Sequence, residues 1–282
     1  MTEIATHAVT TTPLEVPGAL LHYELRGRGP LIALHAAPMN ADAFVPLAEL
    51  LAGEFTVLTS DPRGVHRSRV SDADRDVSPD ERAEDLAALI THVEAGPAVV
   101  VGSSGGAVSA LALLQRHPDL VTTVVAHEPP LADLLPDRDA LHRRTVDMVR
   151  TYVAGDRIGA WREFLDIADI QLPGDVFDMI FGQAPERQAA RDERYSFEHM
   201  ELPTTFWKPD LEQLRSRRDR LIIAIGEDST GQLCDRASRA LAATLSLEPV
   251  GFPGDHIGFV DDPSAFARRL RDVLASRSPE AR

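Results

Sequence analysis

Residues 102–106 consist only of glycine and serine and read G-S-S-G-G, directly after the apolar run 98–101. This spacing matches G-x-S-x-G, a tight turn from a strand into a helix that exposes a serine as a nucleophile. Ser104 occupies the central position. The next amide, that of Gly105, would lie at a helix N-terminus, where an oxyanion can be stabilised. The segment therefore predicts nucleophilic catalysis, although the same residues could simply connect a strand to a helix.

A glycine turn of this kind can also bind phosphate, so that alternative has to be weighed. A P-loop needs a lysine directly after its glycines, and the chain's single lysine, Lys208, lies about a hundred residues away. A dinucleotide site would gain an acid from Glu128, at the end of the next expected strand. However, Ser104 stands where G-x-G-x-x-G needs its middle glycine. The nucleophile interpretation is therefore favoured.

A serine nucleophile needs a general base, and His256 is the best placed of the ten histidines. It lies in the glycine-flanked stretch F-P-G-D-H-I-G-F-V, after the last expected strand, so the chain order serine, acid, histidine is possible. We expect His35, His66 and His127 to be structural or rim residues. In L-H-A-A-P-M-N, after an early strand, Ala37 would donate a second oxyanion amide, and His35 is a weaker candidate for shaping that turn.

The elements that must position these residues alternate between strand and helix patterns. Short apolar or alternating runs predict strands at 18–27, 30–35, 55–61, 98–102, 121–128, 221–226 and 247–252. Helical patterns occupy 41–52, 79–93, 106–116, the stretch through 243, and 263–275. Ser78 and Glu81 form a capping box with Pro79 at the first helical position of the second of these. We therefore expect an α/β fold with a mostly parallel sheet covered by helices on both faces.

Between about 131 and 208 only helical patterns occur, which predicts a helical insertion over the carboxyl edge of the sheet. We divide the chain into a core, residues 1–135 and 209–282, and an inserted lid, residues 136–208. Apolar lid side chains could form a substrate wall, although each could equally pack within the lid. These side chains are Trp161, Phe164, Phe177, Met179, Phe181, Phe206 and Trp207.

Taken together, these motifs resemble the α/β-hydrolase superfamily over nearly the whole chain. The stretch D-P-R-G-V-H-R-S at 61–68 is similar to the turn after that superfamily's fourth strand. The resemblance implies an α/β-hydrolase fold whose helical lid is inserted late in the chain. It excludes a haloalkane dehalogenase, because such an enzyme needs an aspartate at the position of Ser104.

The acid of the triad has two candidates. In the usual superfamily pattern the acid lies three residues beyond a glycine after the lid, but here G-E-D-S places Ser229 there and Asp228 one residue early. Glu128 occupies the other known location, after the strand that follows the nucleophile helix, as in haloalkane dehalogenases. An S-S-G turn followed by H-E-P-P also resembles the zearalenone-lactonase group. We therefore expect Glu128, with Asp228 as the alternative acid.

These residues imply a serine hydrolase that cleaves a carboxylic ester or lactone of an apolar small molecule through an acyl-enzyme. A low-turnover ligand-binding receptor, a cofactor-free haloperoxidase-like enzyme or a C–C bond hydrolase would use the same scaffold. No Cys/His grouping has zinc spacing, and we expect neither a metal nor a cofactor. The substrate and the oligomeric state do not follow from the residues.

The composition bounds the partners and the compartment. A net charge of -15 argues against nucleic acid and anionic membrane as partners. The single cysteine, Cys234, permits no intrachain disulfide. The N-terminus lacks the pattern of a signal peptide and no apolar run reaches membrane-spanning length, so we expect a cytoplasmic protein.

Overall fold

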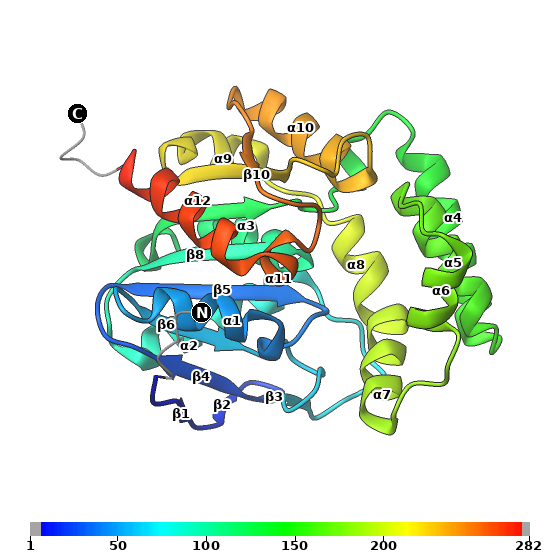
Figure 1. The fold of residues 1–282 in the computed structure, drawn as a ribbon, viewed down its shortest axis with the longest axis horizontal. Coiled ribbons are helices and arrows are strands. Elements are labelled where there is room, and N and C mark those ends of the chain that lie inside the picture. Colours follow the sequence, from blue (N-terminus) through cyan, green and yellow to red (C-terminus); the bar gives the residue numbers. More distant parts are fainter. Residues whose placement is uncertain (1–6, 278–282) are drawn as a thin grey trace.

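A computed structural model describes residues 7–277, which build a central twisted sheet with helices packed on both of its faces (Figure 1). Residues 1–6 and 278–282 lie outside the described part of the chain. They include the start of the N-terminal segment, in which no signal peptide is expected, and both outer ends of the predicted core. No helix within residues 7–277 combines the length and the hydropathy that a membrane span requires.

Eight strands form the main sheet, in the spatial order β1-β4-β6-β5-β8-β9-β10-β11. The pairs from β6 through β11 are parallel, whereas β4 is antiparallel to both β1 and β6. This confirms the mostly parallel sheet. The strands are β1 (Thr10–Thr11), β4 (Tyr23–Arg26), β5 (Leu31–Ala37), β6 (Thr56–Ser60), β8 (Ala98–Ser104), β9 (Val121–His127), β10 (Leu221–Gly226) and β11 (Val250–Phe252).

The expected single strand at 18–27 is wrong, because the chain divides it between two sheets. Its first part pairs within a small sheet of β2 (Leu14–Val16), β3 (Ala19–Leu21) and β7 (Arg69–Val70), and its second part is β4. The break falls at His22, whose amide donates to the Ser68 hydroxyl at 2.9 Å instead of continuing a ladder. The alternation of apolar and polar residues within 18–27 does not reveal this break, because the acceptor comes from a distant loop.

Each face of the main sheet is covered by its own set of helices, and each set buries a separate apolar cluster. One set is α2 (Pro79–Val93), α3 (Gly105–Arg116), α9 (Leu211–Ser216) and α10 (Leu233–Leu245). The other is α1 (Val45–Leu51), α11 (Gly258–Asp261) and α12 (Pro263–Ala275). The predicted capping box is present at the start of α2, where the Glu81 amide donates to Ser78 Oγ and Ser78 N donates to the Glu81 carboxylate.

Between β9 and α9 the described chain is largely helical and lies beside the carboxyl edge of the sheet (Figure 1). Its helices are α4 (Arg138–Val153), α5 (Arg157–Ala168), α6 (Gly174–Phe181), α7 (Arg187–Tyr195) and α8 (Glu201–Thr205), with a π-helical turn at Ser196–Met200 before α8. Several of them share an apolar cluster of their own with the start of α10. The insertion is therefore positioned to cover the strand ends from which the expected catalytic residues project.

Candidate active site

Ser104 ends β8 in a backbone conformation that side chains other than glycine rarely adopt. Its φ is 54° and its ψ is -126°, and α3 begins at the next residue. Such a conformation is costly and persists where the surrounding structure enforces it. It turns the Ser104 side chain out of the strand-to-helix connection, as G-x-S-x-G predicts.

The glycines two residues before and after Ser104 are required by close packing around the turn. A Cβ on Gly102 would lie 2.5 Å from the Gly106 carbonyl oxygen, and a Cβ on Gly106 would lie 2.3 Å from the His35 carbonyl oxygen. Real Cβ atoms do not approach backbone atoms this closely. The glycines therefore let α3 begin directly against β8 and β5, which holds Ser104 at the edge of the sheet.

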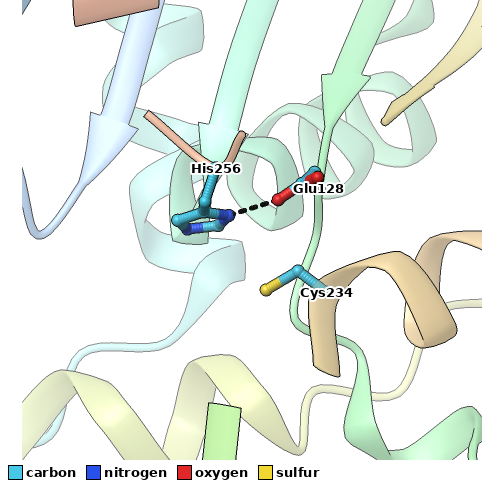
Figure 2. Close-up of side chains that lie close together, drawn as sticks. All are labelled: Glu128, Cys234 and His256. Carbon is cyan, nitrogen blue, oxygen red and sulfur yellow. Dashed lines mark hydrogen bonds and ion pairs between the residues drawn. The ribbon is translucent and has the colours of Figure 1, made fainter. Parts of the chain in front are cut away.

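His256 and Glu128 are joined at the same edge, as Figure 2 shows. The distance from His256 Nδ1 to Glu128 Oε2 is 2.6 Å. Because an ionised carboxylate only accepts, Nδ1 carries the proton and donates it, and Nε2 of the neutral ring keeps its lone pair. None of the Glu128 side chain is exposed, whereas 24% of the His256 side chain is, so the ring remains accessible while its partner does not.

Glu128 is held from two sides at the carboxyl ends of β9 and β10. Its Oε1 accepts from the Gly226 amide at 2.8 Å, and its own amide donates to the Ala224 carbonyl at 3.0 Å. Its φ of 52° turns the chain out of β9. Burial alone would raise the pKa of Glu128, but the hydrogen bond and the charge of His256 outweigh it and lower the pKa, so the carboxylate stays ionised.

The alternative acid, Asp228, does not reach the imidazole. Asp228 is exposed, and its backbone amide donates to the Gly254 carbonyl at 3.0 Å. Ser229, which stands at the usual acid position, is fully buried. The carboxylate that contacts His256 therefore follows β9, and the usual acid position after β10 holds a small hydroxyl.

Cys234, at the start of α10, lies beside the histidine and glutamate pair (Figure 2). Burial of the ring alone would lower the pKa of His256, but the Cys234 sulfur and the Glu128 carboxylate outweigh it and raise that pKa well above its usual value. Within the described residues these three side chains are the one group whose ligand atoms could surround a metal ion, within 4.8 Å of one another.

The two expected oxyanion residues lie next to each other, where β5 ends and where β8 passes into α3. Ala37 ends β5 and stands opposite Ser104 in the parallel register of β5 and β8, and Gly105 is the first residue of α3. Both line the same cavity as Ser104 and His256. No hydrogen bond joins Ser104 to His256 among the described residues, and such bonds commonly tighten when a substrate is present.

The other histidines that the sequence singled out have partners of their own, although the ring centroid of His127 lies 6.5 Å from that of His256. His35 is buried with Nδ1 3.4 Å from Ser60 Oγ, and burial together with the Arg82 charge lowers its pKa to about 3. His127 is buried, and its Nδ1 lies 3.1 Å from Ser103 Oγ. Burial lowers the pKa of His127 to about 4, so both rings are neutral packing elements. His66 is half-buried, and its amide donates to Asp192 at 2.9 Å.

A cavity of about 130 Å³ joins these groups to the helical insertion. Its wall is apolar apart from a few polar side chains, and none of the lining residues is Arg or Lys. From the core come Ala37, Pro38, Ser104, Gly105, Pro130, Gln232, Leu233, Cys234 and His256; from the insertion come Trp161, Phe164, Ile167, Ala168, Ile170, Ser196, Phe197, Met200, Glu201, Thr204 and Thr205.

Two of the seven lid residues expected to contact substrate, Trp161 and Phe164, line this cavity. The other five do not, which corrects the expectation. Phe181 stacks behind Trp161, with ring centroids 4.5 Å apart, and Phe177 packs on Phe181.

The remaining three are directed elsewhere by their neighbours. Met179 is 73% exposed on α6. Phe206 packs edge-on against His142, and the Trp207 indole donates to Asp80 at 3.2 Å. Apolar character alone does not show which face of a helix meets the cavity.

Four further wall residues were not predicted from the sequence: Phe197, Met200, Glu201 and Thr204. Their spacing of i, i+3, i+4 and i+7 is that of one helical face, and it was the available signal. The π-helical turn at 196–200 lies inside this stretch, and π-helical turns are frequent at functional sites.

A second hollow is lined by residues 64–74 and by residues of α7 and the π-helical turn. It is more open, has a volume of about 900 Å³, and is lined by charged residues such as Arg67, Arg191 and Glu198. It contains neither the nucleophile nor the histidine and glutamate pair. The chemistry therefore belongs to the smaller, apolar cavity.

Comparisons with known proteins agree with this architecture. A sequence profile described as alpha/beta hydrolase fold matches residues 29–183. The Bacillus subtilis (strain 168) protein named Uncharacterized hydrolase YraK is 30% identical over 270 residues, which cover 93% of this chain and 94% of that protein. The 2-(acetamidomethylene)succinate hydrolase of Mesorhizobium japonicum (strain LMG 29417 / CECT 9101 / MAFF 303099) is 30% identical over 125 residues, 44% of each chain.

Among solved structures, the chain is similar to an alpha/beta hydrolase from Sphaerobacter thermophilus DSM 20745. The TM-score is 0.68 and the identity 22%, with 95% of this chain and 99% of that chain covered. At this level of identity the similarity shows a shared fold.

Proposed function

The chain belongs to the alpha/beta hydrolase fold family, and from that premise we propose that it is a serine hydrolase that cleaves a carboxylic ester or lactone through an acyl-enzyme. The observation that carries the proposal is the convergence of a strained Ser104 and the His256–Glu128 pair on one cavity. The three side chains come from different strand ends, in the chain order serine, acid, histidine.

The mechanism follows from the positions of these groups. Nε2 of His256 takes the proton of Ser104 Oγ as the oxygen attacks the ester carbonyl, and the amides of Gly105 and Ala37 hold the oxyanion. Glu128 orients the ring through Nδ1 and stabilises the imidazolium. The imidazolium then protonates the departing alkoxide oxygen, which leaves Ser104 acylated.

Deacylation repeats the same proton transfers with water. His256 removes a proton from a water molecule as the water oxygen attacks the acyl carbonyl, and the second tetrahedral intermediate collapses with return of the proton to Ser104 Oγ. In a lactone the alcohol and the acid are parts of one molecule, so the first step opens the ring. The helical insertion would act as a lid that excludes bulk water and supplies binding surface.

The cavity favours an apolar substrate with few anionic groups. Its volume of about 130 Å³ and its wall of aromatic and aliphatic side chains suit a small ester or lactone. One relative's name specifies a succinate, which is a dicarboxylate. Because no Arg or Lys lines the cavity, we do not extend that substrate to this chain.

Labelling with a fluorophosphonate probe tests the nucleophile. We expect the wild type to be labelled at Ser104, the Ser104→Ala variant to stay unlabelled, and the Ser103→Ala variant to be labelled like the wild type. Labelling that persists without Ser104 would contradict the proposal. A panel of aryl esters, thioesters, macrolactones and small lactones then separates an enzyme from a receptor, because a receptor would bind one of them with negligible kcat.

A further inference from the structure

Glu201 is the feature of the cavity that the proposed mechanism does not use. Among the described residues that line the cavity, Glu201 is the one carboxylic acid, and His256 and Cys234 are the other side chains that titrate. Glu201 begins α8, directly after the π-helical turn. The wall around it is largely apolar and contains the aromatic rings of Trp161, Phe164 and Phe197.

Glu201 differs from the two other glutamates of the same helical stretch. Glu193 accepts from the Arg157 guanidinium at 2.7 Å, and Glu198 accepts from the Arg194 guanidinium at 2.9 Å. Within residues 7–277, Glu201 has no ion pair, and its one hydrogen bond is from the Thr205 hydroxyl at 3.2 Å. The acid in the cavity is therefore the one that lacks a basic partner.

An uncompensated carboxylate costs free energy when it is removed from water. Glu201 is half-buried, and this burial raises its pKa to about 7, although the Thr205 hydrogen bond opposes the shift. Near neutral pH the group therefore ionises readily if a positive charge arrives. Perturbed acids in clefts are frequently binding or catalytic groups.

Glu201 is connected to the oxyanion turn through α8, because a residue of the same helix packs against Gly105. Thr204, one helical turn further along, approaches the oxyanion turn so closely that a Cβ on Gly105 would lie 3.1 Å from Thr204 Cγ2. One turn of a helix rises about 5.4 Å. A group held at Glu201 is thus a few bonds away from a carbonyl held at Gly105.

We propose that Glu201 forms a subsite for a cation, so that this cavity takes carboxylic esters that carry an ammonium group a few bonds from the reacting carbonyl. This inference rests on the proposed ester-hydrolase function. The carboxylate supplies the opposite charge, and the aromatic rings of the wall favour a quaternary ammonium through their π faces. None of the lining residues is Arg or Lys, so His256 is the one lining side chain that can carry a positive charge.

The test compares two esters of the same shape, butyrylcholine and its uncharged isostere 3,3-dimethylbutyl butyrate. At pH 8.5, where the Glu201 carboxylate is ionised, we expect the wild type to show a kcat/KM at least about tenfold higher for the choline ester. In Glu201→Gln this preference should disappear, because kcat/KM should fall about tenfold more for the choline ester than for the uncharged ester. Glu201→Asp, which keeps the charge, should retain part of the preference.

Glu198→Gln is the matched control, because it removes an acid from the same stretch that is paired with Arg194 and does not line the cavity. It should leave the preference unchanged. The subsite is overturned if the wild type treats both esters alike, or if Glu201→Gln lowers both rates equally. The wild-type comparison stands even if Glu201→Gln does not fold.

Fluorophosphonate labelling separates the failure of the subsite from the failure of the proposed function. If Ser104 is labelled but neither ester is hydrolysed, the same two esters are compared as protecting ligands against labelling. We expect butyrylcholine to protect at an at least about tenfold lower concentration, and equal protection would overturn the subsite. An unlabelled wild type would instead contradict the hydrolase proposal itself.

Discussion

The carboxyl edge of the sheet and the helical insertion face each other across one cavity, but their residues are specified in different ways. At the sheet edge, Ser104 is set by a strained turn between glycines that no side chain could replace. In the insertion, Phe164 lines the cavity while Met179, of similar character, points into solvent. Chemistry here depends on local backbone geometry, whereas the substrate wall depends on which helical face packs inward.

Replacing Ser104 should produce the largest effect, because it removes the proposed nucleophile and buries no new polar group. Ser104→Ala should lower kcat for ester hydrolysis by on the order of 10⁴ or more. The measurement is steady-state hydrolysis of an aryl ester, with circular dichroism to show that the fold is retained.

Ser103→Ala is the matched control for the turn. Its hydroxyl faces buried His127 instead of the cavity, so activity should change little. Losing this partner should lower the free energy of unfolding by about 1–3 kcal/mol, because a buried ring nitrogen is left unpaired. If Ser103→Ala abolished activity and Ser104→Ala did not, Ser104 would not be the nucleophile of this turn.

The acid provides the second test of the sheet edge. Glu128→Gln should lower kcat by on the order of 10³–10⁴, because the amide no longer stabilises the imidazolium. Asp228→Asn should change kcat less than about tenfold, since Asp228 is exposed and away from the imidazole. A larger loss of kcat for Asp228→Asn than for Glu128→Gln would show that Asp228, after β10, is the acid of the triad.

The pH dependence of kcat/KM tests the electrostatics of the edge. His256 must be neutral to act as a base, and its pKa is raised, so the acid limb should lie above the ordinary value of about 6.5. Below that pKa, kcat/KM should fall about tenfold for each pH unit.

In Glu128→Gln the same limb should move to lower pH, because the carboxylate no longer favours the protonated ring. The two profiles can be measured with one aryl ester across pH 5 to 9. A wild-type limb at or below 6.5 would show that burial outweighs the neighbouring groups of His256.

The wall of the insertion should give the smallest effect. Phe164→Ala should lower kcat/KM for a bulky apolar ester by about tenfold, with a smaller loss for an acetate ester, because it removes contact area without touching the triad. Met179→Ala should leave both values unchanged, since that side chain is exposed. Equal losses of kcat/KM for the two variants would mean that Phe164 contributes no more to substrate binding than the exposed Met179.

The sequence by itself determined the features that depend on neighbouring residues in the chain. The capping box at Ser78, the last helix at 263–275 and the nucleophile turn at Ser104 were all predicted, because caps, helical periodicity and glycine-dependent turns are local. The alternation of strands and helices likewise predicted the mostly parallel sheet.

Only the tertiary structure decided which side chains meet across distant segments. Glu128 and Asp228 were both allowed by chain order, and the choice depends on where the ends of β9 and β10 lie relative to the His256 loop. The raised pKa of Glu201 depends on burial by other elements, which no local pattern encodes. Long-range packing therefore sets the acid and the cavity wall, because both are properties of surfaces that form only when the chain has folded.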